Sequence, residues 1–370
     1  MSNISKVDIH ICDLPTIRPH KLAMTTITTQ AIVIGLITDS DGRQGISEVA
    51  TIGGASYGES TVEAIKANID AYITPHLLGG NPQNFNRIMN DISKQVRGNN
   101  FAKCVIETAM IDLAAKQLEV PAYTLIGGKI HDALPLAWTL ASGDTSKDIE
   151  EAKEMLHQKR HNIFKLKIGS GDPDQNVRHV GEIIKAVGNK ARITVDINQA
   201  WDEYTALKQI KALEEMGVSM IEQPLPSWNY EGMARLTERF DVSILADEAA
   251  TSLEDTYRQI KQRAGDALAL KPAKHGGILQ TQKVAAIAQA AGFGLYGGTM
   301  IESSLGNAIA ASVYSTIPEF KFGTEIFGPL LYKDRLTVED IEVRDFNIQI
   351  PDTIGFGVTL DEEKLAHYKR

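Results

Sequence analysis

The sequence predicts an α/β protein whose larger part is a (β/α)-barrel. From Leu134 onward, short apolar runs alternate with helical segments, the pattern of βαβ units around a parallel sheet. Eight such runs follow one another: LPLAWTLAS, NIFKLKIG, RITVDINQ, SMIEQPL, SILADEA, LALKPAK, FGLYGGTM and KFGTEIFG. A strand, a loop, a helix and a return loop need roughly 25 residues. The polar residues near the ends of successive runs recur every 24 to 29 residues, at Lys167, Asp196, Glu222, Asp247, Lys271, Thr299 and Glu325. This period is that of a barrel.

The first 128 residues lack this repeat and predict a separate α+β unit. A β-rich segment at 30–38, a turn and a second strand near 45–49 indicate a hairpin. Ser60, followed by Glu63 three residues later, predicts a capping box that opens a helix. Two further helices are expected around 83–96 and 100–118, the second with a buried apolar face.

The last 35 residues return to strand-like alternation, a glycine-rich turn and a short charged helix. Such a tail has no place inside a closed barrel, so we expect it to rejoin the N-terminal unit or to cover the barrel's edge. The predicted organisation is therefore an N-terminal unit at 1–128, a barrel at 129–335 and a returning C-terminal segment at 336–370.

Composition and charge exclude several classes of function. The chain has 370 residues, 43% of them hydrophobic and 23% charged, which is ordinary for a globular protein. Its net charge of −9 gives no basic field to attract nucleic acid or an anionic membrane. Apolar runs stay well short of the roughly 20 residues that cross a bilayer. With two cysteines and no signal-peptide pattern, the expected location is the cytoplasm.

Three consecutive strands of the predicted barrel end in carboxylates: Asp196, Glu222 and Asp247. The carboxyl ends of barrel strands meet at one mouth, where these groups would repel one another unless a cation lay between them. Oxygen ligands without His or Cys favour Mg²⁺ or Mn²⁺. An acidic residue at a strand end is often only the N-cap of the next helix, but three in register predict a metal site.

Lysines lie on both sides of this predicted site. Lys165 and Lys167 share one face of their strand, which should be the barrel interior. Buried ammonium groups are costly unless carboxylates are close, and a partly desolvated lysine near a metal suits general acid–base chemistry. Lys271 follows the next strand after the carboxylates and should reach the opposite side. We expect Lys274 and His275 to belong to a loop, with structural or solvated roles.

Neighbours of the predicted ligands are expected to orient them. Asn198, Gln223 and Glu248 lie within two residues of the three carboxylates. Metal and lysines together predict the making or breaking of a carbon–hydrogen bond beside a carboxylate.

The ordered set Lys165-x-Lys167, Asp196-x-Asn198, Glu222-Gln-Pro224, Asp247-Glu248 and Lys271 resembles the muconate-lactonizing subgroup of the enolase superfamily. Enzymes of that superfamily combine Lys or His bases with Mg²⁺ ions that stabilise an ene-diolate. The resemblance covers the whole chain. It implies a modified (β/α)7β TIM-type barrel with an N-terminal α+β capping domain that the C-terminal segment completes. Stretches at 18–24, 51–59 and 323–331 are similar to the subgroup's cycloisomerases.

The resemblance also implies a function and site roles. Those cycloisomerases interconvert cis,cis-muconate and muconolactone through an ene-diolate, in the catechol branch of aromatic degradation (the β-ketoadipate pathway). Asp196, Glu222 and Asp247 would bind Mn²⁺ or Mg²⁺, and Lys167 would carry the proton. Lys271 would help by its charge, while Lys165 would hold the substrate carboxylate and lower the proton affinity of Lys167. Glu325 is expected to face Lys271 or the substrate.

The resemblance further implies that two cap loops select the substrate. The expected contacts are His20, Lys21, Ile52 and Tyr57, with Phe327 on the pocket wall. Ile52 could instead belong to the core, Tyr57 could anchor its loop, and Phe327 could only pack the last strand. The implied partners are a small dicarboxylate and further copies of the chain, in a homo-oligomer such as an octamer.

Alternatives of two kinds remain open at this point. The same machinery serves chloromuconate cycloisomerases, o-succinylbenzoate synthases, N-acylamino-acid racemases and dipeptide epimerases, so it identifies the proton chemistry and not the substrate. The last strand lacks the Asp-x-Asp pattern of dipeptide epimerases. A non-catalytic barrel used for binding is the other alternative, but such a protein has no reason to bury Lys167 and Lys271.

Overall fold

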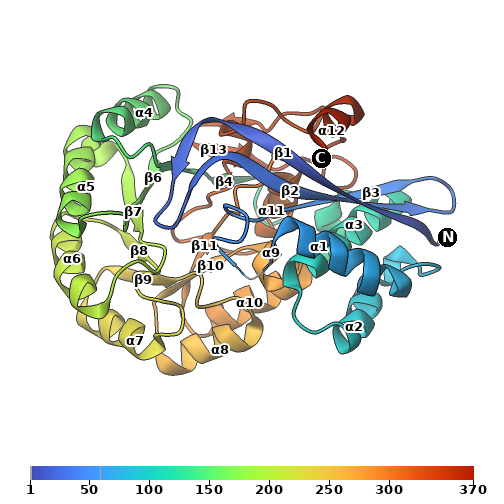
Figure 1. The fold of residues 1–370 in the computed structure, drawn as a ribbon, viewed down its shortest axis with the longest axis horizontal. Coiled ribbons are helices and arrows are strands. Elements are labelled where there is room, and N and C mark those ends of the chain that lie inside the picture. The colour runs from blue at the N-terminus through green and yellow to red at the C-terminus, as the bar shows by residue number, and fades with distance from the viewer. Residues whose placement is uncertain (1, 59) are drawn as a thin grey trace.

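The N-terminal part combines an antiparallel sheet with three α-helices (Figure 1). The structure is a computed structural model that describes residues 2–58 and 60–370. Met1, the first residue of the unit at 1–128, and Glu59, the last residue of the stretch at 51–59, lie outside the described residues. The sheet has the order β1 (Ile4–Lys21), β2 (Thr26–Asp39), β3 (Gln44–Ala50). The helices are α1 (Val62–Asn68), α2 (Phe85–Gln95) and α3 (Asn100–Leu118), with short turns η1 (Ile69–Ile73), η2 (Thr74–His76), η3 (Pro82–Asn84) and η4 (Ala122–Ile126).

The predicted hairpin and the last two predicted helices are confirmed, while two details differ. Strand β1 was not predicted, because Pro15 and Pro19 interrupt its alternation and its pairing with β2 shifts register between Pro15 and His20. The predicted N-cap at Ser60 was wrong. Thr61 caps α1 instead, and its side chain accepts a hydrogen bond from the N–H of Ala64.

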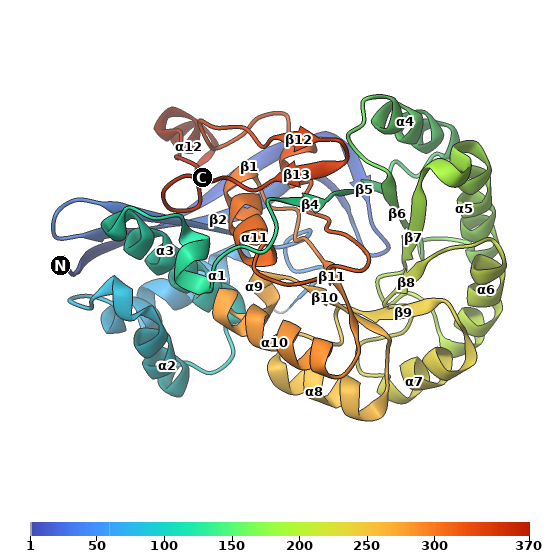
Figure 2. The same cartoon turned by 180° about the vertical axis from the view of Figure 1, so that it is seen from behind.

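The second part is a curled parallel sheet surrounded by helices (Figures 1 and 2). Within the described residues it has seven strands in chain order: β5 (Ala137–Leu140), β6 (Ile163–Lys167), β7 (Arg192–Asp196), β8 (Met220–Glu222), β9 (Ser243–Ala246), β10 (Ala267–Leu270) and β11 (Gly294–Gly297). The helices between and after them are α4 (Thr145–His157), α5 (Pro173–Val187), α6 (Glu203–Glu215), α7 (Tyr230–Arg239), α8 (Leu253–Gln262), α9 (Pro272–His275), α10 (Ile278–Ala290) and α11 (Ser304–Tyr314), with the turns η5 (Gly188–Lys190) and η6 (Gly328–Leu330).

The eighth predicted strand is reduced to a short closing segment. Thr324 forms isolated parallel bridges to Leu136 on one side and Gly297 on the other. The backbone around it cannot extend into a full strand, because Gly323 adopts φ +84°. The segment nevertheless joins the two edges of the curled sheet and places Glu325 inside it.

The C-terminal segment contacts both the start of the barrel and the N-terminal sheet. Strand β13 (Asn347–Gln349) pairs with β4 (Ala133–Pro135) at the start of the barrel, and β12 (Val343–Arg344) pairs with the other side of β13. After α12 (Glu362–Tyr368), Lys369 bridges to Cys12 in β1. Figure 2 shows α12 beside β1, on the N-terminal sheet. No helix in the described part of the chain combines the length and apolar character needed to cross a membrane.

Candidate active site

Strand register brings the predicted carboxylates and lysines to one level of the barrel. Lys167 at the end of β6 pairs with Asp196 at the end of β7, and Asp196 pairs with Glu222 at the end of β8. Asp247 and Lys271 directly follow β9 and β10. Because parallel strands present their carboxyl ends to the same edge, these side chains converge at the mouth.

On the β6 side, each lysine is bound to carboxylates. The Nζ of Lys165 lies 2.8 Å from Glu222 Oε2 and also contacts Glu325. The Nζ of Lys167 lies 2.5 Å from Asp196 Oδ2. Both lysines therefore point into the barrel, as the strand period predicted.

The charge state of Lys165 follows from two opposing effects. Burial lowers its pKa, but Glu222 and Glu325 outweigh burial and hold that pKa well above its ordinary value. The ring of Tyr296 adds a cation–π contact, with Nζ 4.8 Å from the ring centre. Lys165 is thus a fixed positive charge.

On the opposite side, two lysines share one carboxylate. The Nζ of Lys271 lies 2.5 Å from Asp247 Oδ2, and that of Lys274 lies 2.7 Å from Oδ1 of the same residue. Burial raises the pKa of Asp247, but the two lysines outweigh it and hold that pKa below its ordinary value. The prediction that Lys274 and His275 are loop residues was wrong, since both lie in α9 and are buried.

Sequence reasoning missed the role of Lys274 for an identifiable reason. Pro272 begins a short helix, so Lys271 and Lys274 are three residues apart on one helical face. Pro272 was a readable signal for the start of a helix, but four residues are too few to show which way Lys274 points. The expectation for Glu325 also needs correction. Glu325 contacts Lys165 and Thr139 and not Lys271, because the closing segment lies beside β5.

The three neighbours of the carboxylates form hydrogen bonds beside them. The N–H of Asn198 donates to Asp196 Oδ1 at 2.9 Å, and its amide donates to Glu248 Oε1 at 3.2 Å. Gln223 Oε1 accepts from the N–H of Asp247 at 2.9 Å. Asn198 and Gln223 have φ of +45° and +36°, a strained backbone that non-glycine residues seldom adopt.

Of the cap residues, Tyr57 reaches the site directly. Its hydroxyl donates to Asp247 Oδ1 at 3.0 Å and accepts from Lys271 Nζ at 3.2 Å. His20 is buried near Phe327, with 6.3 Å between ring centres. Burial, then Arg18 and Lys167, hold the pKa of His20 well below its ordinary value, so its ring is neutral.

The remaining predicted contacts occupy different surroundings. Ile52 is buried in the apolar core. Phe327 is buried and packs on Trp138, with ring centres 5.0 Å apart. Lys21 is exposed and borders, together with Lys167, a cavity of about 290 Å³ beside the mouth.

The buried donor set has features that suit a cation. Glu222 Oε1, Glu248 Oε2 and Asn198 Oδ1 are buried and have no hydrogen-bond partner among the described residues. Burial and the neighbouring Asp196 raise the pKa of Glu222 to about 8, although Lys165 opposes them. As the described residues stand, no three His, Cys, Asp or Glu side chains surround one point closely enough to hold a metal. Lysine ammonium groups hydrogen-bond the carboxylates, and the unpartnered oxygens remain free to accept a cation.

Comparisons with known proteins agree with this geometry. Residues 6–127 match the family described as mandelate racemase / muconate lactonizing enzyme, N-terminal domain, and residues 147–364 match the family described as enolase C-terminal domain-like. Muconate cycloisomerase 1 of Acinetobacter baylyi is 46% identical over 98% of this chain and 99% of its own length. A chloromuconate cycloisomerase of Cupriavidus necator is 44% identical over 99% of each chain.

Solved structures show the same likeness. A crystal structure of muconate lactonizing enzyme from Pseudomonas fluorescens, complexed with muconolactone, superposes with a TM-score of 0.98. It is 45% identical and the match covers 100% of both chains. The chain therefore belongs to the muconate and chloromuconate cycloisomerase family of the enolase superfamily, whose members are isomerases.

Proposed function

We propose that this chain catalyses the reversible lactonization of cis,cis-muconate to muconolactone, assisted by a divalent cation. The observation that carries the proposal is the position of Lys167, whose ammonium group lies at the mouth beside Asp196 and borders a cavity. Support for the substrate comes from relatives that match the full length of the chain and are named as muconate cycloisomerases.

The proton step follows from the placement of Lys167. One carboxylate oxygen of the diacid forms a C–O bond to a carbon of its own conjugated system, and the π electrons move toward the other carboxylate. Lys167 then gives its proton to the carbon next to that carboxylate, so that a C–H bond forms. In the reverse direction it takes the proton back. Solvent returns a proton to Lys167, so the muconate dianion and one proton give the muconolactone monoanion. The acid forms of substrate and product have the same composition, which makes the reaction an isomerisation.

The other lysines bind and orient the substrate. Lys165 is held by Glu222 and Glu325, so its charge is fixed before the substrate arrives. Lys271 lies on the opposite side and supplies a second positive charge next to Tyr57. Phe327 and Ile52 are apolar and favour the carbon chain of the substrate over water.

Asp196, Glu222 and Asp247 are the proposed ligands of Mn²⁺ or Mg²⁺, with Asn198, Gln223 and Glu248 orienting them. Their oxygen atoms match what these cations prefer, and the unpartnered oxygen of Glu222 supports the assignment. When bound, the cation would stabilise the negative charge that develops on the substrate carboxylate.

A direct assay tests the proposal. Purified protein with Mn²⁺ and cis,cis-muconate should cause loss of the ultraviolet absorbance of the diene. Removal of the metal with a chelator should abolish turnover, and added Mn²⁺ or Mg²⁺ should restore it. A Mn²⁺ titration followed by electron paramagnetic resonance gives a readout that is independent of activity. The proposal is wrong if metal-loaded protein turns over neither plain nor chlorinated muconates.

A chloromuconate is the second candidate substrate, because relatives named for it match equally well, at 44% identity. Comparing kcat/KM for plain and chlorinated muconates decides between the two. A higher kcat/KM for plain muconate is the expected result.

A further inference from the structure

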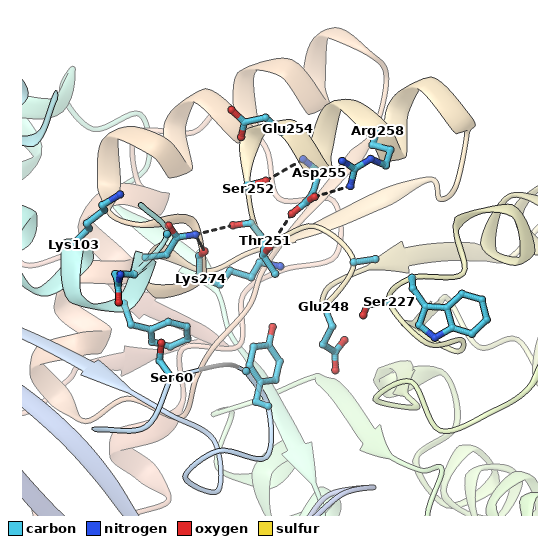
Figure 3. A pocket seen from close by; sticks show the side chains of 18 of the residues that line it. Ser60, Lys103, Ser227, Glu248, Thr251, Ser252, Glu254, Asp255, Arg258 and Lys274 are labelled. Atoms are coloured by element: carbon cyan, nitrogen blue, oxygen red, sulfur yellow. Dashed lines mark hydrogen bonds and ion pairs between the residues drawn. The ribbon is translucent and has the colours of Figure 1, made fainter. Parts of the chain in front are cut away.

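A large groove leads from the surface to the candidate site along the boundary between the N-terminal part and the barrel. Its volume is about 880 Å³. Figure 3 shows Lys103 at one side of this pocket and Ser227 at the other, with Lys274 and Glu248 between them. Tyr57 also lines it, and the Tyr57 hydroxyl binds Asp247 in the site. The groove is therefore continuous with the barrel mouth.

The cations of this groove differ in how they are paired. Arg258 lies 2.9 Å from Asp255, and Lys274 lies 2.7 Å from Asp247. Lys103 and Arg97 have no hydrogen bond or ion pair from their side chains to any described residue. Arg97 lies just before α3 and Lys103 in its first turn, and both line the groove, so this unpaired positive charge belongs to one segment of the wall.

Lys103 is unusual because it is also buried, with 9% of its surface exposed. Burial and then the neighbouring Arg97 guanidinium lower its pKa from the ordinary value. The burial concerns the aliphatic stem, because the ammonium group opens onto the groove. A partly desolvated ammonium group without a carboxylate partner is less favourable than a paired one. An anion bound in the groove would provide the missing partner.

The charge of the whole molecule gives such an anion a reason to bind there. At −9, the chain as a whole repels a dianion. A groove with unpaired cations on one wall attracts it locally, since the low-dielectric walls concentrate the field. Glu254 and Glu248 also line the groove, away from Lys103 in Figure 3, so an anion is favoured on the α3 side.

We propose that Lys103 and Arg97 form a capture site that binds a dicarboxylate in the groove before it reaches the barrel mouth. The substrate class rests on the proposed function; the existence of an anion site on this wall does not. The capture site raises the rate at which substrate arrives and takes no part in the chemistry.

The first test is steady-state kinetics at two salt concentrations. Lys103→Met and Arg97→Gln should each lower kcat/KM for muconate about threefold to tenfold at roughly 20 mM salt, with kcat unchanged. At about 0.5 M salt the difference from the parent chain should disappear. Lys211→Gln is the matched control: it removes one exposed charge from α6, far from the groove. Equal salt slopes for Lys103→Met and Lys211→Gln would overturn the proposal, as would a fall in kcat alone.

Two observations control for misfolding of the variants: the behaviour of Arg97→Gln and the melting temperature of Lys103→Met. Arg97 is exposed, so its substitution leaves the core intact. Lys103→Met should melt at the same temperature as the parent chain or higher, because the ammonium group that it removes has no partner among the described residues. A lower melting temperature together with normal kinetics for Arg97→Gln would mean that Lys103 is structural, and the proposal would fail.

A binding experiment separates this proposal from the proposed function. Trp228 is exposed in the groove and can report binding of adipate, a saturated dicarboxylate, in stopped-flow fluorescence. The association rate at low salt should fall threefold to tenfold in both variants and not in Lys211→Gln. If the parent chain turns over no muconate but this dependence is present, the proposed function fails and the capture site stands. If muconate is turned over and adipate association is unaffected, only the capture site fails.

Discussion

Two regions of this protein hold buried carboxylates that are neutralised in different ways. At the barrel mouth, Asp196 and Asp247 face lysines, which outweigh burial and keep the pKa values of both below the ordinary value. At the junction between the N-terminal part and the barrel, Glu48 and Glu107 face the N-termini of α11 and α10. Burial raises their pKa values to about 7 and about 8.

The difference shows what each region is built to do. Backbone N–H groups and a serine hydroxyl satisfy Glu48 and Glu107 without bringing a full positive charge, so these residues join helices to the N-terminal part. Lysines bring full charge and movable protons. Asp196 and Asp247 at the mouth therefore stay ionised next to proton donors, while Glu48 and Glu107 at the junction can become neutral.

The largest expected effect comes from removing the proton carrier at the mouth. Lys167→Met should lower kcat for muconate about 1,000-fold, roughly 4 kcal/mol, since general acid catalysis is lost. In this variant Asp196 would still have the Lys165 ammonium group 3.8 Å away as a positive partner, so the fold should persist. The ultraviolet assay measures the loss, circular dichroism checks folding, and Lys211→Met is the control. Full activity in the folded variant would show that another group carries the proton.

A pH-dependent effect is expected at the junction. The pKa of Glu48 rises from 4.5 unfolded to about 7 folded, so its contribution to stability is present below pH 4.5 and is lost as pH rises through 7. The shift corresponds to about 3 kcal/mol. Urea unfolding at pH 5 and pH 8 should therefore show a larger loss of stability for the parent chain than for Glu48→Gln. If the parent chain and Glu48→Gln lost the same stability between pH 5 and pH 8, Glu48 would stay ionised. The junction would then not differ from the mouth in the charge state of its carboxylates.

A smaller effect is expected from a steric clash between Glu107 and the start of α10, the helix that it contacts. A Cβ at Gly277 would collide with the Glu107 carboxylate, and Gly277 adopts φ +126°. Gly277→Ala should lower the free energy of unfolding by roughly 2 kcal/mol. Gly42→Ala is the matched control: its φ is +84° and nothing lies within 4 Å, so it should lose only about 1 kcal/mol of backbone strain. Equal losses would show that contact with Glu107 has no energetic weight.

The smallest effect concerns the doubly paired carboxylate at the mouth. Lys274→Met leaves Asp247 bound to Lys271 and Tyr57 but removes one positive charge beside a proposed metal ligand. Mn²⁺ should then bind about fivefold more tightly, roughly 1 kcal/mol, because a competing cation has gone. Electron paramagnetic resonance titration measures the change. Weaker Mn²⁺ binding would instead identify Lys274 as the group that positions Asp247.

The barrel and the mouth were largely predictable, because both depend on local patterns. The strand–helix period set the repeat, and β-strand alternation set the direction of Lys165 and Lys167. The strand β1, the closing segment around Thr324 and the burial of Lys274 were not predictable in the same way. Prolines interrupt the alternation of β1, and a single glycine at positive φ shortens the closing segment. The four-residue helix α9 turns Lys274 inward.

By itself, the sequence determined which groups end the barrel strands and hence which chemistry is available, since the alternation of strands and helices fixes where strands end. Only the tertiary structure decided how those groups are paired. Glu325 faces Lys165 and Asp247 holds two lysines because strand register and the path of α9 set distances between residues far apart in the chain. Ion pairs depend on those distances and on burial, and neither can be obtained from spacing along the sequence.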